Sequence, residues 1–366
     1  MCGITGFTGK RNHALSEKML AAIAHRGQDE RIIWSEGGFN LGMNRLAIND
    51  LRPGLYPMKF RRLRLVYNGE IYNAGQLRLK LKAQGVKLPS NCDGEVILPL
   101  YHQYGVKSFS MLDGMFALAI IDLDKKKVIL ARDKFGEKPL FYSIVQGELM
   151  FASEVKALLA SKKVDKTIST NSLSEYLQQG YVFAPRTLLK SVNKLQAGHY
   201  LMYGGKGLTT KPYFQLKAGE ETIEDMGEEN LVKILEKKIR SAVKSRLLSD
   251  VPVGCFLSGG VDSSLITLFA SKEIKNLHTF SVSFADGKHD ESRYSKRVSR
   301  LLGTNHHEVI CSPEAAKLLI EGWGEITDEP ICDAAMIPTY LLSQTAAKFV
   351  KVVLTGEGAD EIFGGY

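Results

Sequence analysis

The second residue of the chain is a cysteine, and its position could give it a chemistry of its own. Cys2 directly follows the initiator Met1. Methionine is normally removed when a small residue comes next, which would leave Cys2 with a free α-amine of pKa about 7.7–8.0. That amine can accept the thiol proton and act as a built-in general base. Cys2 is therefore a candidate nucleophile for an amide carbonyl, although a cysteine at this position, taken alone, is more often incidental.

A glycine-rich loop is the second feature that could do chemistry. Residues 251–257 read as a buried strand, residues 258–264 have the sequence SGGVDSS, and a helical pattern covers 262–272. Backbone N–H groups at such a helix start, next to glycines without a Cβ, form a cradle for anions. The loop lacks the lysine of a Walker A motif, so γ-phosphate transfer is not indicated. A generic glycine turn is the alternative interpretation.

A second loop is predicted to reach the same place. Residues 351–354 read as a strand, and the sequence TGEGADE follows at 355–361. Ligand sites of open α/β sheets form at the carboxyl edge of the strands, where both loops would lie. The glycines permit close backbone approach, while Glu357 and Asp360 offer carboxylates for Mg²⁺ and for a substrate. By itself this acidic pair also fits an ordinary helix N-terminus.

The elements that must position these residues follow two patterns. Residues 1–205 contain short apolar runs between Gly, Asn and Asp turns, with helical patterns at 74–84 and 95–104. This predicts an α+β domain of stacked antiparallel sheets. From residue 228 to residue 366 strands alternate with helices, which predicts an α/β domain with a parallel sheet. Residues 206–227, rich in Gly, Lys and Glu, are interpreted as a linker.

Composition excludes several classes of protein. The 366 residues carry a net charge of +8, but the basic residues are scattered, so a nucleic-acid partner is not expected. No apolar run approaches the length of a membrane span, so no membrane partner is expected either. The five cysteines are odd in number and form no C-x-x-C pair. That argues against a disulfide framework and a zinc site and indicates a reducing, cytoplasmic location.

Ordered motifs in the first domain resemble those of the class II glutamine amidotransferase domain, an Ntn (N-terminal nucleophile) hydrolase. The motifs are MCGITGF at 1–7, HRGQD at 25–29, NRL at 44–46, NGEIYN at 68–73, DGE at 93–95, ARDKFGEKP at 131–139 and FASEVK at 151–156. The resemblance covers residues 1 to about 200. It implies an Ntn-hydrolase sandwich in which Cys2 is the catalytic nucleophile and glutamine the nitrogen donor.

The resemblance also implies roles for the matched residues. Arg45 would clamp the glutamine α-carboxylate, and Asp93 and Glu70 would bind the α-ammonium. The Asn68 side chain and the Gly69 N–H would stabilise the tetrahedral oxyanion, which makes both catalytic. The expected glutamine-binding residues are Arg45, Leu46, Ala47, Ile48, Asn49, Asn68, Gly69, Glu70 and Asp93.

The SGGVDSS loop resembles the PP-loop of ATP pyrophosphatases, which release pyrophosphate as an acyl-adenylate forms. By this resemblance Asp262 holds Mg²⁺ together with Asp360, and Glu357 acts as a catalytic residue that assists the acyl-adenylate. The expected ATP-binding residues are Phe256, Leu257, Ser258, Gly259, Gly260, Asp262, Ser263, Ser264, Val282, Thr355 and Gly356.

The succession of a glutaminase domain and a PP-loop domain resembles the glutamine-hydrolysing asparagine synthetase family over the whole chain. The resemblance implies a carbon–nitrogen ligase that converts aspartate, glutamine, ATP and water to asparagine, glutamate, AMP and diphosphate. Its partners would be these small molecules, and a homodimer is compatible with it. Met115 and its apolar neighbours would line a conduit for ammonia between the sites.

Two departures from the family pattern leave alternatives open. Well-known members carry a Thr and an Arg for the aspartate carboxylate in the segment that corresponds to residues 328–339, and this segment has no Arg. The acceptor could therefore be another carboxylate, such as a sugar acid or a peptide. The chain also stops at Tyr366, before the region that carries a family lysine. We therefore expect a fragment or a truncated product, for which a glutaminase-only or regulatory role is the alternative.

Overall fold

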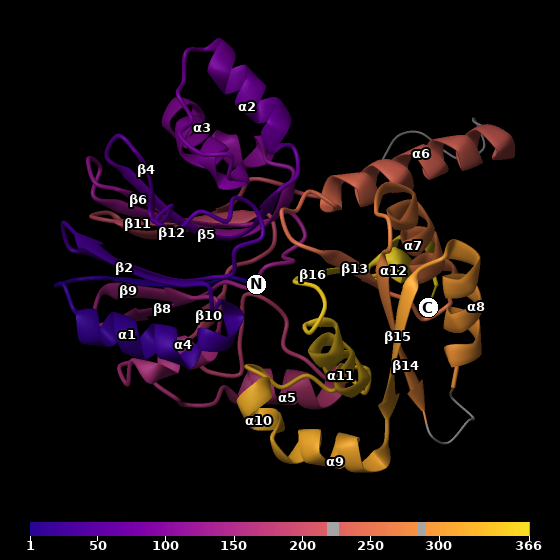
Figure 1. The fold of residues 1–366 in the computed structure, drawn as a ribbon. Coiled ribbons are helices and arrows are strands. Elements are labelled where there is room, and N and C mark those ends of the chain that lie inside the picture. The colour runs from indigo at the N-terminus through magenta and orange to yellow at the C-terminus, as the bar shows by residue number, and fades with distance from the viewer. Residues whose placement is uncertain (218–226, 285–289, 366) are drawn as a thin grey trace. The chain divides into compact units, whose positions relative to one another are not determined.

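The chain forms two compact units in the computed structural model, which describes residues 1–217, 227–284 and 290–365 (Figure 1). The first unit comprises Met1–Lys217 together with Thr327–Cys332. The second comprises the described residues within Ala218–Ile326 and Asp333–Tyr366. Among the described residues, no helix has the length and apolar character needed to cross a bilayer.

Two six-stranded antiparallel sheets form the centre of the first unit. The order in one sheet is β10 (Asn193–Lys194), β8 (Phe141–Val145), β9 (Glu148–Ala152), β1 (Gly3–Thr8), β3 (Phe39–Arg45) and β2 (Glu30–Glu36). The order in the other is β12 (Gly207–Pro212), β11 (His199–Gly204), β7 (Lys127–Arg132), β6 (Gly114–Asp122), β5 (Leu63–Ile71) and β4 (Met58–Phe60). Every pairing within both sheets is antiparallel.

Alternation along the strands explains why the two sheets stack on each other. In β6, Ala117 and Ala119 belong to the apolar cluster between the sheets, whereas Leu118 and Ile120 belong to the cluster on the opposite face. A strand with a period of two can bury both faces only when each face is covered. Both faces are covered here, which accounts for the unbroken apolar run in this strand.

Helices cover the outer faces of both sheets and complete a four-layer sandwich (Figure 1). Helices α1 (His13–Ala22) and α4 (Val155–Ala160) pack on the first sheet, and α2 (Ala74–Ala83) and α3 (Ile97–Tyr104) pack on the second. Helix α5 (Thr170–Gln179) and 3₁₀ helices at Ala24–Arg26, Asp93–Val96 and Gly105–Met111 complete this unit. The predicted α+β sandwich is thereby confirmed.

The first unit departs from the predicted boundaries in two places. Residues 207–212, expected within the linker at 206–227, form β12 and pair with β11, so the sheet extends further than predicted. Residues 218–226 of that predicted linker lie outside the described part of the chain. The short segment Thr327–Cys332 belongs to the first unit, because the Asp328 carboxylate accepts hydrogen bonds from Val155 N and Lys156 N at the start of α4.

A parallel sheet with the strand order β15–β14–β13–β16 organises the second unit. Its elements in chain order are α6 (Glu228–Arg246), β13 (Val253–Phe256), α7 (Val261–Glu273), β14 (His278–Phe284), α8 (Ser292–Leu302), β15 (Asn305–Cys311), α9 (Pro313–Glu321), α10 (Trp323–Ile326), α11 (Met336–Ala346), β16 (Val352–Leu354) and α12 (Ala359–Phe363). The predicted alternation of strands and helices and the parallel sheet are confirmed.

Apolar residues cover the two faces of this parallel sheet separately. Val243 of α6 and Phe269 of α7 join one cluster, and Leu342 and Ala346 of α11 join another around Phe280 of β14. The last strand, β16, pairs with β13 although about a hundred residues separate them in sequence. This pairing brings the loops after β13 and β16 to the same sheet edge.

Candidate active sites

Strand pairing in the first unit fixes the position of Cys2. Gly3 of β1 lies opposite Asn44 of β3, so Cys2 falls beside the end of β3. The Cys2 Sγ lies 3.4 Å from the backbone N of Leu46, which donates to it, and 3.5 Å from the Leu46 carbonyl oxygen. Arg26 Nε donates to the Cys2 carbonyl oxygen at 3.0 Å. The nucleophile candidate is thus held through both its backbone and its side chain.

The buried carboxylate of Glu154 positions Arg26, which in turn donates to the Cys2 backbone. Glu154 accepts a hydrogen bond from Arg26 at 2.7 Å and contacts His25 Nε2 at 3.0 Å. Burial acts to raise the pKa of Glu154, but the hydrogen bonds from His25 and Arg26 outweigh it and lower that pKa to about 2. Glu154 therefore stays ionised down to strongly acidic pH, and its charge compensates that of buried Arg26.

Burial dominates the acid–base properties of the chain start. It raises the pKa of the Cys2 thiol, against the Leu46 N–H and the positive charges of the amino terminus, Arg45 and Arg26. Burial also lowers the pKa of the amino terminus to about 6, helped by Arg26 and Lys138. This value is that of the Met1 amine, which is therefore mostly unprotonated at neutral pH, the form in which an amine can accept a proton.

A cavity of about 50 Å³ lies in front of Cys2. Its lining residues are Met1, Cys2, Arg45, Leu46, Ile48, Asn49, Tyr56, Tyr67, Asn68, Gly69, Glu70, Cys92, Asp93, Met115 and Lys138. All the expected glutamine-binding residues line it except Ala47, whose backbone N donates to Asp29 instead. A space of this size holds only a few water molecules. Met1 forms part of its wall, so removal of Met1 would enlarge it.

Two groups in this cavity have unused capacity for a polar ligand. The Asn68 Nδ2 atom is buried and has no hydrogen-bond partner among the described residues. Arg45 uses three of its five N–H donors on Glu30 and on the carbonyls of Asp50 and Arg52. Its remaining donors can therefore still bind a carboxylate.

Gly69 lets strand β5 approach β6 closely at this cavity. A Cβ on Gly69 would lie 2.1 Å from the Met115 carbonyl oxygen and 2.6 Å from Phe116 Cα. No side chain fits there without a shift of the backbone, so glycine is required beside Asn68. Met115 does line the cavity, but its expected part in an ammonia conduit stays a prediction.

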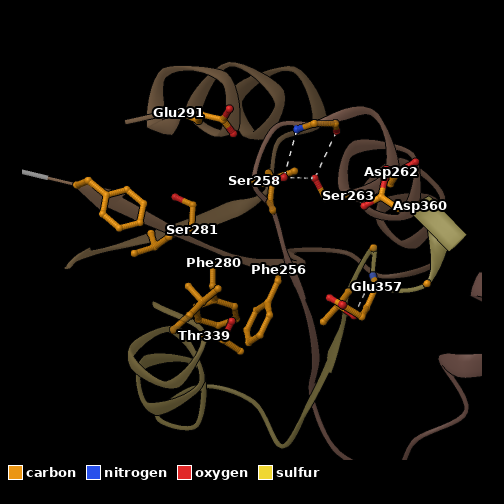
Figure 2. Close-up of a pocket in the computed structure, with 18 residues that line it drawn as sticks. Phe256, Ser258, Asp262, Ser263, Phe280, Ser281, Glu291, Thr339, Glu357 and Asp360 are labelled. Carbon is orange, nitrogen blue, oxygen red and sulfur yellow. Dashed lines mark hydrogen bonds between the residues drawn. The ribbon is translucent and has the colours of Figure 1, made fainter. Parts of the chain in front are cut away.

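The second unit contains a larger cavity of about 380 Å³ at the carboxyl edge of its sheet. The residues that line it are Phe256, Leu257, Ser258, Gly260, Asp262, Ser263, Phe280, Ser281, Val282, Phe284, Glu291, Thr339, Leu342, Thr355, Gly356, Glu357, Gly358 and Asp360. Figure 2 shows Asp262 and Asp360 together at one end, and Phe256, Phe280 and Thr339 at another. One end of the pocket is thus acidic and the other predominantly apolar.

Hydrogen bonds within the glycine loop, residues 258–264, fix its conformation. Ser258 Oγ and Ser263 Oγ lie 2.9 Å apart, and Gly260 N donates to Ser258 Oγ at 3.3 Å (Figure 2). Gly259 has a φ of +92°, and a Cβ there would lie 2.6 Å from the backbone N of Ser295. Of the expected ATP-binding residues, only Gly259 and Ser264 do not line the cavity. The Ser264 hydroxyl is buried and has no partner among the described residues.

Two carboxylates could hold a metal ion in this pocket. A Cβ on Gly356 would lie 3.2 Å from Asp262 Cβ, which shows how closely the two loops approach. Asp262 and Asp360 both line the cavity, whereas the described residues contain no cluster of three or more candidate ligands. Mg²⁺ commonly uses one or two carboxylates and completes its shell with phosphate oxygens and water. The pair fits that pattern when a phosphate ligand is present.

The sequence analysis missed several residues of both cavities. Tyr56, Tyr67, Cys92 and Lys138 line the smaller one, and Phe280, Ser281, Phe284, Glu291, Thr339, Leu342 and Gly358 line the larger one. Tyr67 and Cys92 directly precede Asn68 and Asp93, which was the only local signal. Adjacent residues of a strand point to opposite faces of the sheet, and His306 and His307 have separate partners: Thr279 and Ser281 for His306, and His278 for His307.

Comparison with known protein families finds a match for each of the two units. The glutamine amidotransferase domain family matches residues 1–214, and the asparagine synthase family matches residues 235–366. The chain is 35% identical over 395 residues to a candidate glutamine-hydrolysing asparagine synthetase, number 2, of Methanocaldococcus jannaschii; the match covers the whole chain and 76% of that protein.

Two further relatives also match the whole chain. Identity is 36% over 376 residues to glutamine-hydrolysing asparagine synthetase 1 of Bacillus subtilis, of which the match covers 59%. It is 31% over 403 residues to amidase chry2 of Gibberella zeae, of which the match again covers 59%. The chain thus spans about three fifths to three quarters of the length of these relatives.

The buried Glu154 generates a prediction about acid stability. Its pKa of about 2 in the folded state lies below the ordinary value of 4.5, so its stabilising effect is complete above pH 4.5 and is lost as the pH falls toward 2. We expect Glu154→Gln to reduce the loss of unfolding free energy between pH 6 and pH 3 by about 2 kcal/mol. Urea denaturation at both pH values measures this difference.

The control for this experiment is Glu17→Gln, whose carboxylate forms a half-exposed ion pair with Arg31. It should leave the pH dependence of unfolding nearly unchanged. An unaltered pH dependence in Glu154→Gln would show that the ionised carboxylate does not stabilise the fold.

Proposed function

We propose that this chain, which belongs to the glutamine-hydrolysing asparagine synthetase family, supplies ammonia from glutamine in its first unit and activates a carboxylate with Mg-ATP in its second. The observation that carries the proposal is the presence of both cavities in one chain, each lined by nearly all the residues that its chemistry requires. The product would be an amide, with glutamate, AMP and diphosphate released.

Glutamine hydrolysis follows from the groups around Cys2. Once Met1 is removed, the α-amine of Cys2 takes the thiol proton, and the sulfur attacks the amide carbon of glutamine. The unpaired Asn68 Nδ2 and the Gly69 N–H stabilise the oxyanion that forms. The amine then returns the proton to the leaving nitrogen, which departs as ammonia. Water hydrolyses the remaining thioester and releases glutamate.

Glutamine binding follows from the charges in the same cavity. The free donors of Arg45 suit the α-carboxylate, while Asp93 and Glu70 suit the α-ammonium. An amino acid has both charged groups and would use both sets of contacts, whereas a simple amide has neither. The cavity would therefore discriminate glutamine from a simple amide.

Carboxylate activation follows from the larger cavity. The glycine loop and the start of α7 offer backbone N–H groups to phosphates, and the apolar end around Phe256 and Phe280 suits the adenine. Bound Mg²⁺ would be held by Asp262 and Asp360 and would offset the charge of the leaving pyrophosphate. Glu357, which lines the same cavity, would assist the acyl-adenylate, which ammonia then attacks to form the amide and release AMP.

Aspartate is the acceptor that the family name favours, but another carboxylate is the second candidate. The segment 328–339 has no arginine for a second carboxylate, and one relative is named an amidase. Measurement of pyrophosphate release with aspartate, sugar acids and peptides separates the candidates. Stimulation by aspartate is expected; stimulation by another acid alone would contradict asparagine synthesis, and glutamate release without AMP formation would indicate a glutaminase only.

The first prediction concerns the nucleophile. Cys2→Ala should lower glutamine hydrolysis on the order of 10⁶-fold, to background, because the attacking atom is gone. Ammonia-dependent amide synthesis should persist, since it bypasses this site. Glutamate release and mass spectrometry of the mature amino terminus measure the outcome, with exposed Cys332→Ser as the matched thiol control. Retained glutaminase activity in Cys2→Ala, or loss of both activities, would contradict the two-site scheme.

A second prediction concerns the glycine loop. Gly259→Ala should weaken Mg-ATP binding about tenfold or more, because its φ of +92° and its contact with α8 force the loop to move. Isothermal titration calorimetry with a non-hydrolysable ATP analogue measures the affinity. Gly324→Ala is the control, since a Cβ there meets no atom within 4 Å. Equal affinities of Gly259→Ala and wild type would show that the loop does not bind the phosphates.

A further inference from the structure

Two tyrosines, the buried Tyr67 and the partly buried Tyr56, lie beside the charged groups of the smaller cavity. Tyr67 lies in β5 directly before Asn68 and is almost completely buried. Its hydroxyl lies 2.5 Å from Asp93 Oδ1, while the backbone N of Ile71 donates to Asp93 Oδ2 at 2.6 Å. Each carboxylate oxygen of Asp93 therefore has a fixed donor. Both donors belong to β5, so this strand fixes the orientation of the Asp93 carboxylate in the cavity.

Tyr56 connects this arrangement to the arginine of the same cavity. The Arg45 guanidinium lies 5.5 Å from the centroid of the Tyr56 ring, and the Tyr56 and Tyr67 rings lie 6.2 Å apart. The Tyr56 hydroxyl lies 3.8 Å from Cys92 Sγ, next to Asp93 in sequence. The tyrosine pair, Tyr56 and Tyr67, therefore spans the distance between the cationic and the anionic groups.

The chemistry of the tyrosines fixes the direction of the bond to Asp93. Burial, with the nearby charge of Asp93, raises the pKa of Tyr67 well above its ordinary value. The hydroxyl therefore stays protonated and can only donate to the carboxylate. Burial raises the pKa of Asp93 above its ordinary value, and the bonds from Tyr67 and Ile71 reduce that rise. Without the hydroxyl, the buried carboxylate would be less well stabilised as an anion.

We propose that Tyr67 is a positioning residue for substrate recognition: by donating to Asp93 it holds that carboxylate in place and aimed at the α-ammonium of glutamine. This inference rests on the proposed glutaminase function and deepens it. Tyr67 acts on binding and not on the reacting amide, because its hydroxyl is engaged with Asp93. It sets the preference for an α-amino acid over an amide that lacks the α-ammonium.

The test compares Tyr67→Phe with wild type on two substrates, L-glutamine and glutaramate, the analogue without the α-amine. We expect KM for glutamine to rise about tenfold with kcat changed less than about twofold. The kcat/KM for glutaramate should stay the same, so the preference for glutamine should fall about tenfold. Tyr213→Phe is the matched control, because Tyr213 also donates from a hydroxyl, to the Arg132 carbonyl at 2.7 Å, and does not line the cavity.

A double-mutant cycle with Asp93→Asn provides a second readout that needs glutamine only. If Tyr67 acts through Asp93, Tyr67→Phe should change KM less than about twofold in the Asp93→Asn background. Additive losses, or an unaltered KM in Tyr67→Phe, would overturn the inference. An equal fall of kcat/KM on both substrates would show a merely structural role. Failure of wild type to release glutamate from glutamine would instead contradict the proposed function itself.

Discussion

The register of strand pairing is the constraint on which both cavities depend. The pairing of Gly3 with Asn44 sets Cys2 against the end of β3, and the pairing of Gly69 with Phe116 draws the Asn68–Gly69 backbone close to β6. A slip of one residue would turn each side chain to the other face of its sheet. In the second unit, the pairing of β13 with β16 has the same effect on the two loops. Backbone pairing next to each cavity thus decides which side chains meet there.

A buried polar group without a partner among the described residues lies at the smaller cavity. An unsatisfied buried donor or acceptor costs about 1–3 kcal/mol, so folded proteins keep few of them. That group is Asn68 Nδ2; the unpartnered Ser264 hydroxyl, by contrast, does not line the larger cavity. A ligand that bonds to such a group recovers this free energy on binding. The stability lost in the free protein is then regained as affinity or as stabilisation of a transition state.

The sequence allowed much of the fold and part of each site to be predicted. Apolar periodicity predicted the sandwich and the parallel sheet, because it reflects which faces a strand or helix buries. Ordered motifs predicted Cys2 and the glycine loop, whose chemistry depends on neighbours in sequence. Tyr56 and Thr339 were missed, since their neighbours in space come from distant segments. The strand β12 was taken for a linker because its exposed Gly, Thr and Lys residues lack the apolar alternation of the other strands.

The segment Thr327–Cys332 interrupts the second unit in sequence, which limits how the two units can be separated. It belongs to the first unit although the stretches before and after it belong to the second. Asp328 receives the first N–H groups of α4, the helix that follows Glu154, and Glu329 pairs with Lys194 at 3.0 Å. The two units are therefore not separable by one cut in the polypeptide. A gene fragment that encodes residues 1–217 alone would contain α4 but not Asp328, which accepts hydrogen bonds from the start of that helix. An exchange of the first unit between genes would therefore have to include the segment Thr327–Cys332 as well.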